Sequence, residues 1–100
     1  MRILGISCSP RKGKSTKVAL EVCLQAVNEA APDAETALIE LAEMKINGCV
    51  ACGKCMKVLE CSQEDDFAKM IPILSDTALA GLVVATPVYL GSMTSQCKAF

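Results

Sequence analysis

The amino-acid sequence predicts a doubly wound α/β fold built on a parallel β-sheet. Short apolar runs alternate with segments of helical period, turn residues separate them, and the last apolar run is rich in valine. Strands that alternate with helices form βαβ units, and right-handed crossovers would place the first strand between the second and the third. With 100 residues, the chain provides for one domain with a modest core.

The first strand is predicted at residues 3–8, "ILGISC", because the polar loop "SPRKGKST" follows it at residues 9–16. A helix is expected next, with Ser15 or Thr16 as its cap and Pro32 as its stop. Its predicted apolar face consists of side chains that recur at helical spacing, namely Val18, Ala19, Val22, Cys23, Ala26, Val27 and Ala30.

The middle of the chain predicts a second strand and then a long loop. Residues 35–41, "ETALIEL", alternate well enough for a strand. The following stretch has no clear period and contains a cysteine cluster at about residues 47–63. Asp65 or Asp66 is expected to cap the next helix, in which Pro72 would cause a kink or a late start.

The third strand is predicted at residues 79–87, "LAGLVVATP", and its apolar character is typical of a strand covered on both faces. A further helix would open at about residues 92–95. With only three strands, the third would form an exposed apolar edge, so we expect a longer protein or a partner that covers it.

Composition excludes several classes of function. The net charge of −1 and the lack of a basic block speak against nucleic-acid binding and membrane-surface binding. No apolar run is long enough for a membrane span and no signal peptide is recognisable, so we expect a cytoplasmic protein. The absence of histidine excludes imidazole ligands and Ser-His or Cys-His catalysis.

The loop at residues 9–16 has the composition of a phosphate cradle. It leaves a strand and enters a helix, whose N-terminus favours anions. It lacks a Walker A or GxGxxG pattern, and an ordinary polar βα loop with solvated lysines is the alternative. The groups offered to a phosphate are the hydroxyls of Ser9, Ser15 and Thr16 and the cations of Arg11, Lys12 and Lys14.

The loop after the third strand, "TPVYLGS" at residues 86–92, would converge on the same site. Ligands of open parallel sheets bind beyond the carboxyl ends of the strands. Tyr89 could pack against a flat heterocycle there, or it could simply cover the end of the sheet.

Four cysteines at Cys49, Cys52, Cys55 and Cys61 form the pattern C-x2-C-x2-C-x5-C. Clustered cysteines in a reducing compartment bind metal or perform redox chemistry more often than they form disulfides. Such tight spacing suits a [4Fe–4S] cluster, whereas structural zinc sites separate their two halves further; zinc and metal-free thiols remain alternatives. The remaining cysteines, Cys8, Cys23 and Cys97, are predicted to be structural, although Cys97 could be exposed.

Three ordered motifs together carry a family resemblance. "ILGISCSPRKGKST", the cysteine run and "ATPVYLGSMTSQCKAF" resemble the N-terminal half of the NADPH-dependent FMN reductase group, and most of all the iron–sulfur flavoproteins of anaerobic prokaryotes. The resemblance implies a flavodoxin-like, three-layer α/β/α fold with its first three strands present, so that residues 1–100 form an FMN-binding domain incomplete at its C-terminal side. The family usually has Gly at the position of Cys8, and the side chain of Cys8 would crowd the approach of a flavin.

The resemblance also implies cofactors and their sites. FMN would bind its phosphate through Ser9, Arg11, Ser15 and Thr16, and its isoalloxazine ring would contact Pro87, Val88, Tyr89, Gly91 and Ser92. The four clustered cysteines, Cys49, Cys52, Cys55 and Cys61, match the ligands of the family's [4Fe–4S] cluster one by one.

The function that follows is a redox flavoprotein, an oxidoreductase that relays electrons between a small-molecule or protein donor and an acceptor. NAD(P)H is a candidate donor, a ferredoxin-like protein is a candidate partner, and we expect a homo-oligomer, either a dimer or a tetramer. No side chain is nominated as a catalytic acid or base. The alternatives are an NAD(P)H-dependent FMN or quinone reductase without a cluster, and a non-enzymatic zinc-binding or regulatory module.

Overall fold

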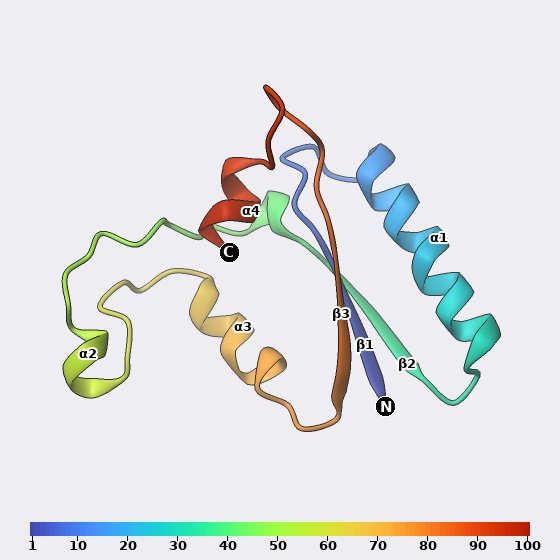
Figure 1. Cartoon of the computed structure of the whole chain (residues 1–100), viewed down its shortest axis with the longest axis horizontal. Coiled ribbons are helices and arrows are strands. Elements are labelled where there is room, and N and C mark those ends of the chain that lie inside the picture. Colours follow the sequence, from blue (N-terminus) through green and yellow to red (C-terminus); the bar gives the residue numbers. More distant parts are fainter.

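The structure is a computed structural model that describes all residues, 1–100. Its centre is a parallel sheet of three strands, β1 (Arg2–Ser7), β2 (Glu35–Glu40) and β3 (Leu79–Ala85), in the order β2-β1-β3. Helices lie on both sides of this sheet (Figure 1). The three-layer α/β/α fold and the central position of the first strand are therefore as predicted.

Strand β1 pairs along its full length with both neighbours. Ile6 lies opposite Ile39 of β2 and opposite Val84 of β3, so these three side chains share one face of the sheet. Gly5 lies opposite Leu38 and Val83 on the other face. The two faces are covered by different helices.

Helix α1 (Ser15–Ala30) covers the face that carries Gly5. It buries Leu20 and Leu24, and a Cβ at Gly5 would lie 3.0 Å from a methyl group of Leu24, so the missing side chain makes room for the helix. The apolar face predicted for this helix is wrong, because Val18 and Val22 are more than half exposed.

Three further expectations for this helix can be compared with the structure. Cys23 is exposed and does not belong to the core. The cap expected at Ser15 or Thr16 lies instead at Lys14, and no side chain caps the helix. The end of the helix before Pro32 is as predicted, since α1 stops at Ala30.

Helices α3 (Phe67–Leu74) and α4 (Ser95–Ala99) cover the opposite face (Figure 1). The core on this side consists of Leu4, Ile6, Cys8, Leu41 and Met70, all buried. The aromatic rings of the first residue of α3 and the last residue of the chain meet edge to face, with centroids 6.0 Å apart.

Helix α3 runs through Pro72 and begins after Asp66. Its first turn is held by Asp65, whose carboxylate accepts from the backbone N–H of Phe67 at 3.1 Å. Pro72 has no backbone N–H, so α3 lacks the hydrogen bond that this position would otherwise donate to the carbonyl four residues earlier.

Strand β3 is not covered on both faces as predicted. Its burial alternates along the strand, and Leu82 and Val84 remain 46% and 43% exposed. Helix α3 reaches the side of β1 but leaves these two side chains of the outer strand open to solvent. The exposed apolar edge at the third strand is, by contrast, as expected.

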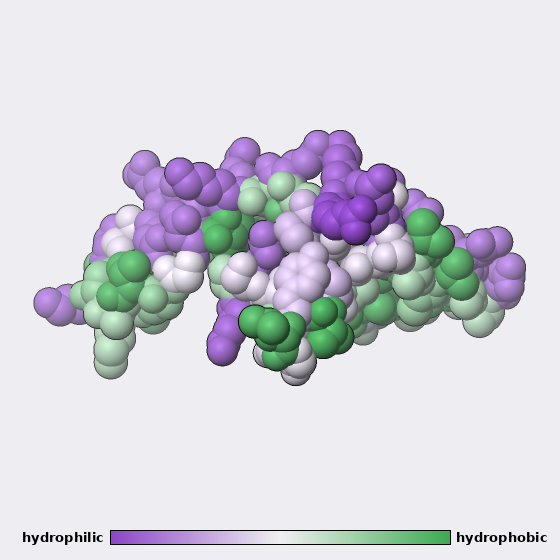
Figure 2. Space-filling model, turned by 90° about the horizontal axis from the view of Figure 1, so that it is seen from above, coloured by the Kyte–Doolittle hydropathy of each residue, from purple (hydrophilic) through white to green (hydrophobic).

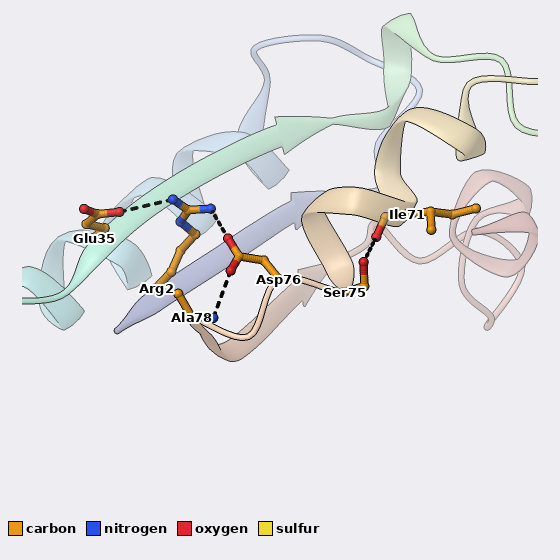
Figure 3. A network of polar contacts seen from close by, with 6 residues as sticks. All are labelled: Arg2, Glu35, Ile71, Ser75, Asp76 and Ala78. Carbon is orange, nitrogen blue, oxygen red and sulfur yellow. Dashed lines mark hydrogen bonds and ion pairs between the residues drawn. The ribbon is translucent and has the colours of Figure 1, made fainter.

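The amino end of the sheet is fixed by Arg2 (Figure 3). Its guanidinium donates to Asp76 at 2.8 Å and to Glu35 at 3.3 Å. Asp76 also accepts from the backbone N–H of Ala78 at 2.9 Å, and the Arg2 backbone N–H donates to the Ala78 carbonyl at 2.9 Å. One side chain thus connects β1, the start of β2 and the turn that leads into β3.

Candidate functional site

Two loops meet at the carboxyl edge of the sheet, at the top of Figure 1. One follows β1 and leads into α1, and the other follows β3 and leads into α4. The Cys8 backbone N–H donates to the Ala85 carbonyl at 2.8 Å, which continues the pairing of β1 and β3 to the roots of both loops. The structure therefore brings together the two segments that the sequence nominated for a ligand.

The loop after β1 is ordered from within by Ser9. This side chain is 5% exposed, and its hydroxyl accepts from the Arg11 backbone N–H at 3.1 Å and donates to the Arg11 carbonyl at 3.2 Å. The Arg11 side chain itself is exposed and forms no ion pair within the chain. Its guanidinium is available for an anion in solution.

The start of α1 presents backbone donors at the same edge. No side chain caps the helix, so its first N–H groups have no side-chain acceptor. Ser15 is exposed and Thr16 is half-buried in this first turn. Such a helix end favours a bound anion, because backbone donors and the helix dipole act in the same direction.

Two glutamates compete with an anion for this loop. Glu40 accepts from the Gly13 backbone N–H at 2.9 Å, where Gly13 has a φ of +70°. Glu43 forms an ion pair with Lys12, and this hydrogen bond raises the pKa of Lys12 above its ordinary value. Neither carboxylate was predicted as part of the site, because Glu40 ends β2, Glu43 follows it, and both come close to the loop after β1 only in the folded chain.

The loop after β3 ends in a tight turn. The backbone groups of Tyr89 and Ser92 exchange two hydrogen bonds of 2.9 and 3.1 Å, closing a two-residue turn at Leu90 and Gly91. Positive φ angles of 52° and 78° at these central positions match a type I′ turn. Leucine is unusual there, since the left-handed conformation favours glycine.

This turn exposes apolar side chains. Val88 is 72% exposed, Tyr89 is 47% exposed and Leu90 is fully exposed. Pro87 is half-buried at the base of the loop. Figure 2, which views the molecule from above, shows hydrophobic surface lying open among hydrophilic side chains. An exposed apolar surface beside polar donors is typical of a ligand site or an interface.

Thr94 connects the roots of both loops. It is 1% exposed, and its hydroxyl donates to the Cys8 carbonyl at 2.7 Å and accepts from the Cys97 backbone N–H at 3.1 Å. Its own N–H donates to the hydroxyl of Thr86 at 3.2 Å. Thr94 was not predicted as part of the site, although a threonine directly before a helix is a recognised cap signal.

The cysteine loop leaves the body of the molecule between residues 44 and 66 and extends to the left in Figure 1. Paired hydrogen bonds close its base. Lys45 N–H donates to the Asp66 carboxylate at 2.6 Å, and Asp66 N–H donates to the Lys45 carbonyl at 2.9 Å. Asn47 N–H donates to Asp65 at 2.8 Å. We call these four residues the stem.

Hydrogen bonds beyond the stem draw the two sides of the loop together. Gln63 donates to the Gly48 carbonyl at 2.8 Å, and Cys52 Sγ and Ser62 Oγ lie 2.9 Å apart. The hydrogen bond to Ser62, followed by one from the Lys54 backbone, lowers the pKa of the Cys52 thiol. Ser62 follows the last of the four cysteines, so the contact spans the motif.

The four cysteines are all exposed, and they are not gathered around one point. Cys55 begins the short helix α2 (Cys55–Val58), while Cys49 and Cys52 lie in the irregular segment before it. No three cysteine, aspartate or glutamate side chains in the chain are grouped so that they could hold a metal ion. Four thiolates are suitable ligands for iron or zinc, but in this structure the four sulfur atoms do not lie close enough together to share one metal site.

Two open grooves lie on the surface. One of about 690 Å³ lies between the root of the cysteine loop and α4, and its lining includes Cys49, Asn47 and Lys98. The other, of about 470 Å³, lies between α1 and β2, away from both loops. None of the helices has the length and apolar character that crossing a membrane would require.

Comparison with known proteins decides the family, because residues 1–100 match NADPH-dependent FMN reductase along the whole chain. The chain belongs to the NADPH-dependent FMN reductase family. This membership confirms the resemblance on which the flavodoxin-like fold was predicted.

Curated relatives in this family carry the name iron–sulfur flavoprotein. One from Archaeoglobus fulgidus is 38% identical over 97 residues, which is 97% of this chain and 47% of the relative. One from Methanosarcina thermophila is 34% identical over 99 residues, which is 99% of this chain and 50% of the relative. One from Methanocaldococcus jannaschii is 31% identical over 98 residues, which is 98% of this chain and 49% of the relative. The chain thus spans about half the length of these relatives.

Proposed function

We propose that this chain is the FMN-binding region of an oxidoreductase that also carries a [4Fe–4S] cluster and relays electrons between a donor and an acceptor. The observation that carries the proposal is the shared carboxyl edge, where an uncapped helix end and an exposed aromatic turn are joined at their roots by Thr94. The family and the names of the relatives support it.

The phosphate of FMN would bind at the loop after β1. The groups proposed are Ser9, Arg11, Ser15 and Thr16, which lie in the ordered loop and in the first helical turn. Ser9 would act mainly by holding the Arg11 backbone, because its hydroxyl already makes two hydrogen bonds to it. Arg11, which has no ion-pair partner in the chain, would supply the positive charge.

The isoalloxazine ring would lie against the loop after β3. Its proposed contacts are Pro87, Val88, Tyr89, Gly91 and Ser92, in a turn that offers exposed apolar surface and a backbone fixed by two hydrogen bonds. When bound, a flavin can accept an electron pair and release electrons singly. The contribution of this chain would be to position the ring and to shield one of its faces.

The proposed ligands of the cluster are Cys49, Cys52, Cys55 and Cys61. Their chemistry fits, since four thiolates within thirteen residues are the usual donor set of such a cluster. The stem fixes the base of the loop, and the exposed tip has no core packing that would resist a change of shape. Holding a cluster requires the tip to close so that the four sulfurs converge.

A second candidate function is an NAD(P)H-dependent FMN or quinone reductase without a cluster. The dispersed sulfur positions favour it, because they form no metal site as they stand. In both candidates the protein would act as a cytoplasmic homo-oligomer, a dimer or a tetramer, with a small-molecule or protein electron donor.

Oxygen-free purification followed by reconstitution with iron, sulfide and FMN tests these proposals. The first candidate expects bound FMN and about four iron atoms per chain, with flavin bands over a broad absorption. Cys52→Ser should lose the iron and keep the FMN, whereas the matched control Cys23→Ser, an exposed cysteine on α1, should keep both. FMN without iron would support the second candidate, and neither FMN nor iron would reject both.

A further inference from the structure

Two cysteines outside the clustered motif meet at the base of the candidate flavin site. Cys8 directly follows β1 and is completely buried, and Cys97 lies half-buried in the first turn of α4. They are 89 positions apart in the sequence, yet both belong to the same apolar cluster. From the sequence alone, each of them was predicted to be a separate structural residue.

One buried hydroxyl connects their backbones. Thr94 Oγ1 donates to the carbonyl of Cys8 at 2.7 Å and accepts from the N–H of Cys97 at 3.1 Å. The side chains are neighbours as well, since Cys97 packs against the apolar cluster to which Cys8 belongs. Burial, and after it the nearby Cys97 side chain, raises the pKa of the Cys8 thiol to about 12. Both cysteines are free thiols in this structure.

We propose that Cys8 and Cys97 are a redox modification site, a dithiol that a small-molecule disulfide converts reversibly into an intramolecular disulfide. The bond would tie the end of β1, from which the loop of residues 9–16 starts, to the helix that follows the turn at Tyr89. Its effect on FMN would rest on the proposed function, but formation of the bond does not.

The chemistry has a defined order. The half-buried Cys97 reacts first, since Cys8 is inaccessible and remains protonated. The Cys97 thiolate attacks a small disulfide RSSR, forms a mixed disulfide and releases one RS⁻. Cys8 then gives its proton to a thiolate and attacks the sulfur of Cys97, and a second RS⁻ leaves. Two protein thiols are oxidised, and one RSSR is reduced to two RSH.

Peptide mapping can identify this bond without ambiguity. Cleavage after lysine and arginine places Cys8 alone on residues 3–11, Cys97 alone on residues 70–98 and Cys23 alone on residues 18–45. The full protein is incubated with glutathione at several ratios of disulfide to thiol. Free thiols are then alkylated, and the peptides are identified by mass.

The proposal expects the peptides of Cys8 and Cys97 to be joined in a fraction that follows the glutathione ratio and returns to zero with dithiothreitol. If Cys8 paired at random with the other six cysteines, about one in six of its disulfides would be with Cys97. In the folded protein, the fraction of Cys8 disulfides that are with Cys97 should exceed this by up to about six-fold. The same incubation in guanidinium chloride should lower this share to the random level or below it, since an unfolded chain pairs distant cysteines less readily than nearby ones.

Two variants test the order of the reaction. In Cys8→Ala, Cys97 should accumulate as a mixed disulfide with glutathione, and in Cys97→Ser, Cys8 should stay a free thiol at every ratio. The proposal is overturned if Cys8 of the unmodified protein remains a free thiol throughout, or if it pairs as often with the loop cysteines as with Cys97. Neither result depends on whether FMN binds.

Discussion

Replacing Thr94 by valine removes one hydroxyl while keeping the size and shape of the side chain. The hydroxyl is the hydrogen-bond partner of the buried Cys8 carbonyl and the cap of α4. Thr94 is 1% exposed, so water cannot easily replace it. The change therefore tests whether the roots of the two loops are held together as the structure indicates.

The expected loss of stability follows from these contacts. Leaving a buried carbonyl without a partner costs about 1–3 kcal/mol. Losing a threonine cap costs about 1 kcal/mol. Since the two effects share one hydroxyl and are not fully additive, we expect the free energy of unfolding to fall by about 2–3 kcal/mol. For a chain of this size, that lowers the midpoint of thermal unfolding by roughly 10–20 °C.

Chemical and thermal denaturation followed by circular dichroism measure this difference. Thr36→Val is the matched control, because the Thr36 hydroxyl accepts only from Asn28, at 3.2 Å and in a hydrogen bond that is exposed to solvent. We expect the control to change the free energy of unfolding by less than about 0.5 kcal/mol. If Thr94→Val is no more destabilising than Thr36→Val, the Thr94 hydroxyl does not hold the two loop roots together.

Three further predictions concern the loops and the stem. Arg11→Ala should weaken FMN binding by roughly 10- to 100-fold and riboflavin binding much less, as fluorescence titration would detect, since only FMN carries a phosphate; equal losses would contradict the phosphate assignment. Leu90→Gly should raise the free energy of unfolding by about 0.5–1 kcal/mol, because it relieves a left-handed leucine that buries nothing, and a lower thermal midpoint would count against this. The hydrogen bond from Lys45 lowers the pKa of Asp66 below its ordinary value of 3.8. The ionised carboxylate therefore stabilises the stem above pH 3.8, and this stabilisation is lost as the pH falls through the lowered pKa of Asp66 in the folded protein. The NMR signal of the Lys45 amide should shift over that acid range. In Asp66→Asn, the same signal should not shift.

The architecture could be predicted because its signals are local. The first and third strands are short apolar runs and the second alternates between apolar and polar residues, and the turn residues around each strand lie within a few positions along the chain. The order β2-β1-β3 then follows from the right-handed crossover, and the loops fall at the carboxyl edge without further information.

The buried face of α1 could not be chosen from the sequence, because this helix carries two apolar stripes. The stripe with Val18 and Val22 recurs at helical spacing as well as the one with Leu20 and Leu24 does. What decides between them is the sheet, where Gly5 leaves room for the two leucines. That fit is a tertiary contact, which periodicity alone does not contain.

The parts of the site that escaped prediction depend on contacts between distant residues. Glu40 accepts a hydrogen bond from the loop after β1, although a carboxylate at its position would usually be expected to be solvated. Asp65 and Asp66 were expected only as helix caps, and their hydrogen bonds to the Asn47 and Lys45 N–H groups also close the stem. The cysteine pattern predicts a donor set but not its shape. How four sulfurs lie in space depends on the fold of the loop tip, which no local signal determines.

The contacts of Arg2 lie at the amino end of the sheet, opposite the two loops of the candidate site. We expect the two ends of the sheet to differ in how well they tolerate substitutions. Hydrogen bonds and ion pairs of Arg2 join β1 to the start of β2 and to the turn before β3, where the pairing of β1 with β3 shifts between Arg2 and Ile3. The loops after β1 and β3 take no part in these contacts, so a change in their length is expected to leave the contacts of Arg2 in place. A different cofactor preference should therefore be sought by redesigning the loops after β1 and β3 while keeping Arg2, Glu35 and Asp76 unchanged.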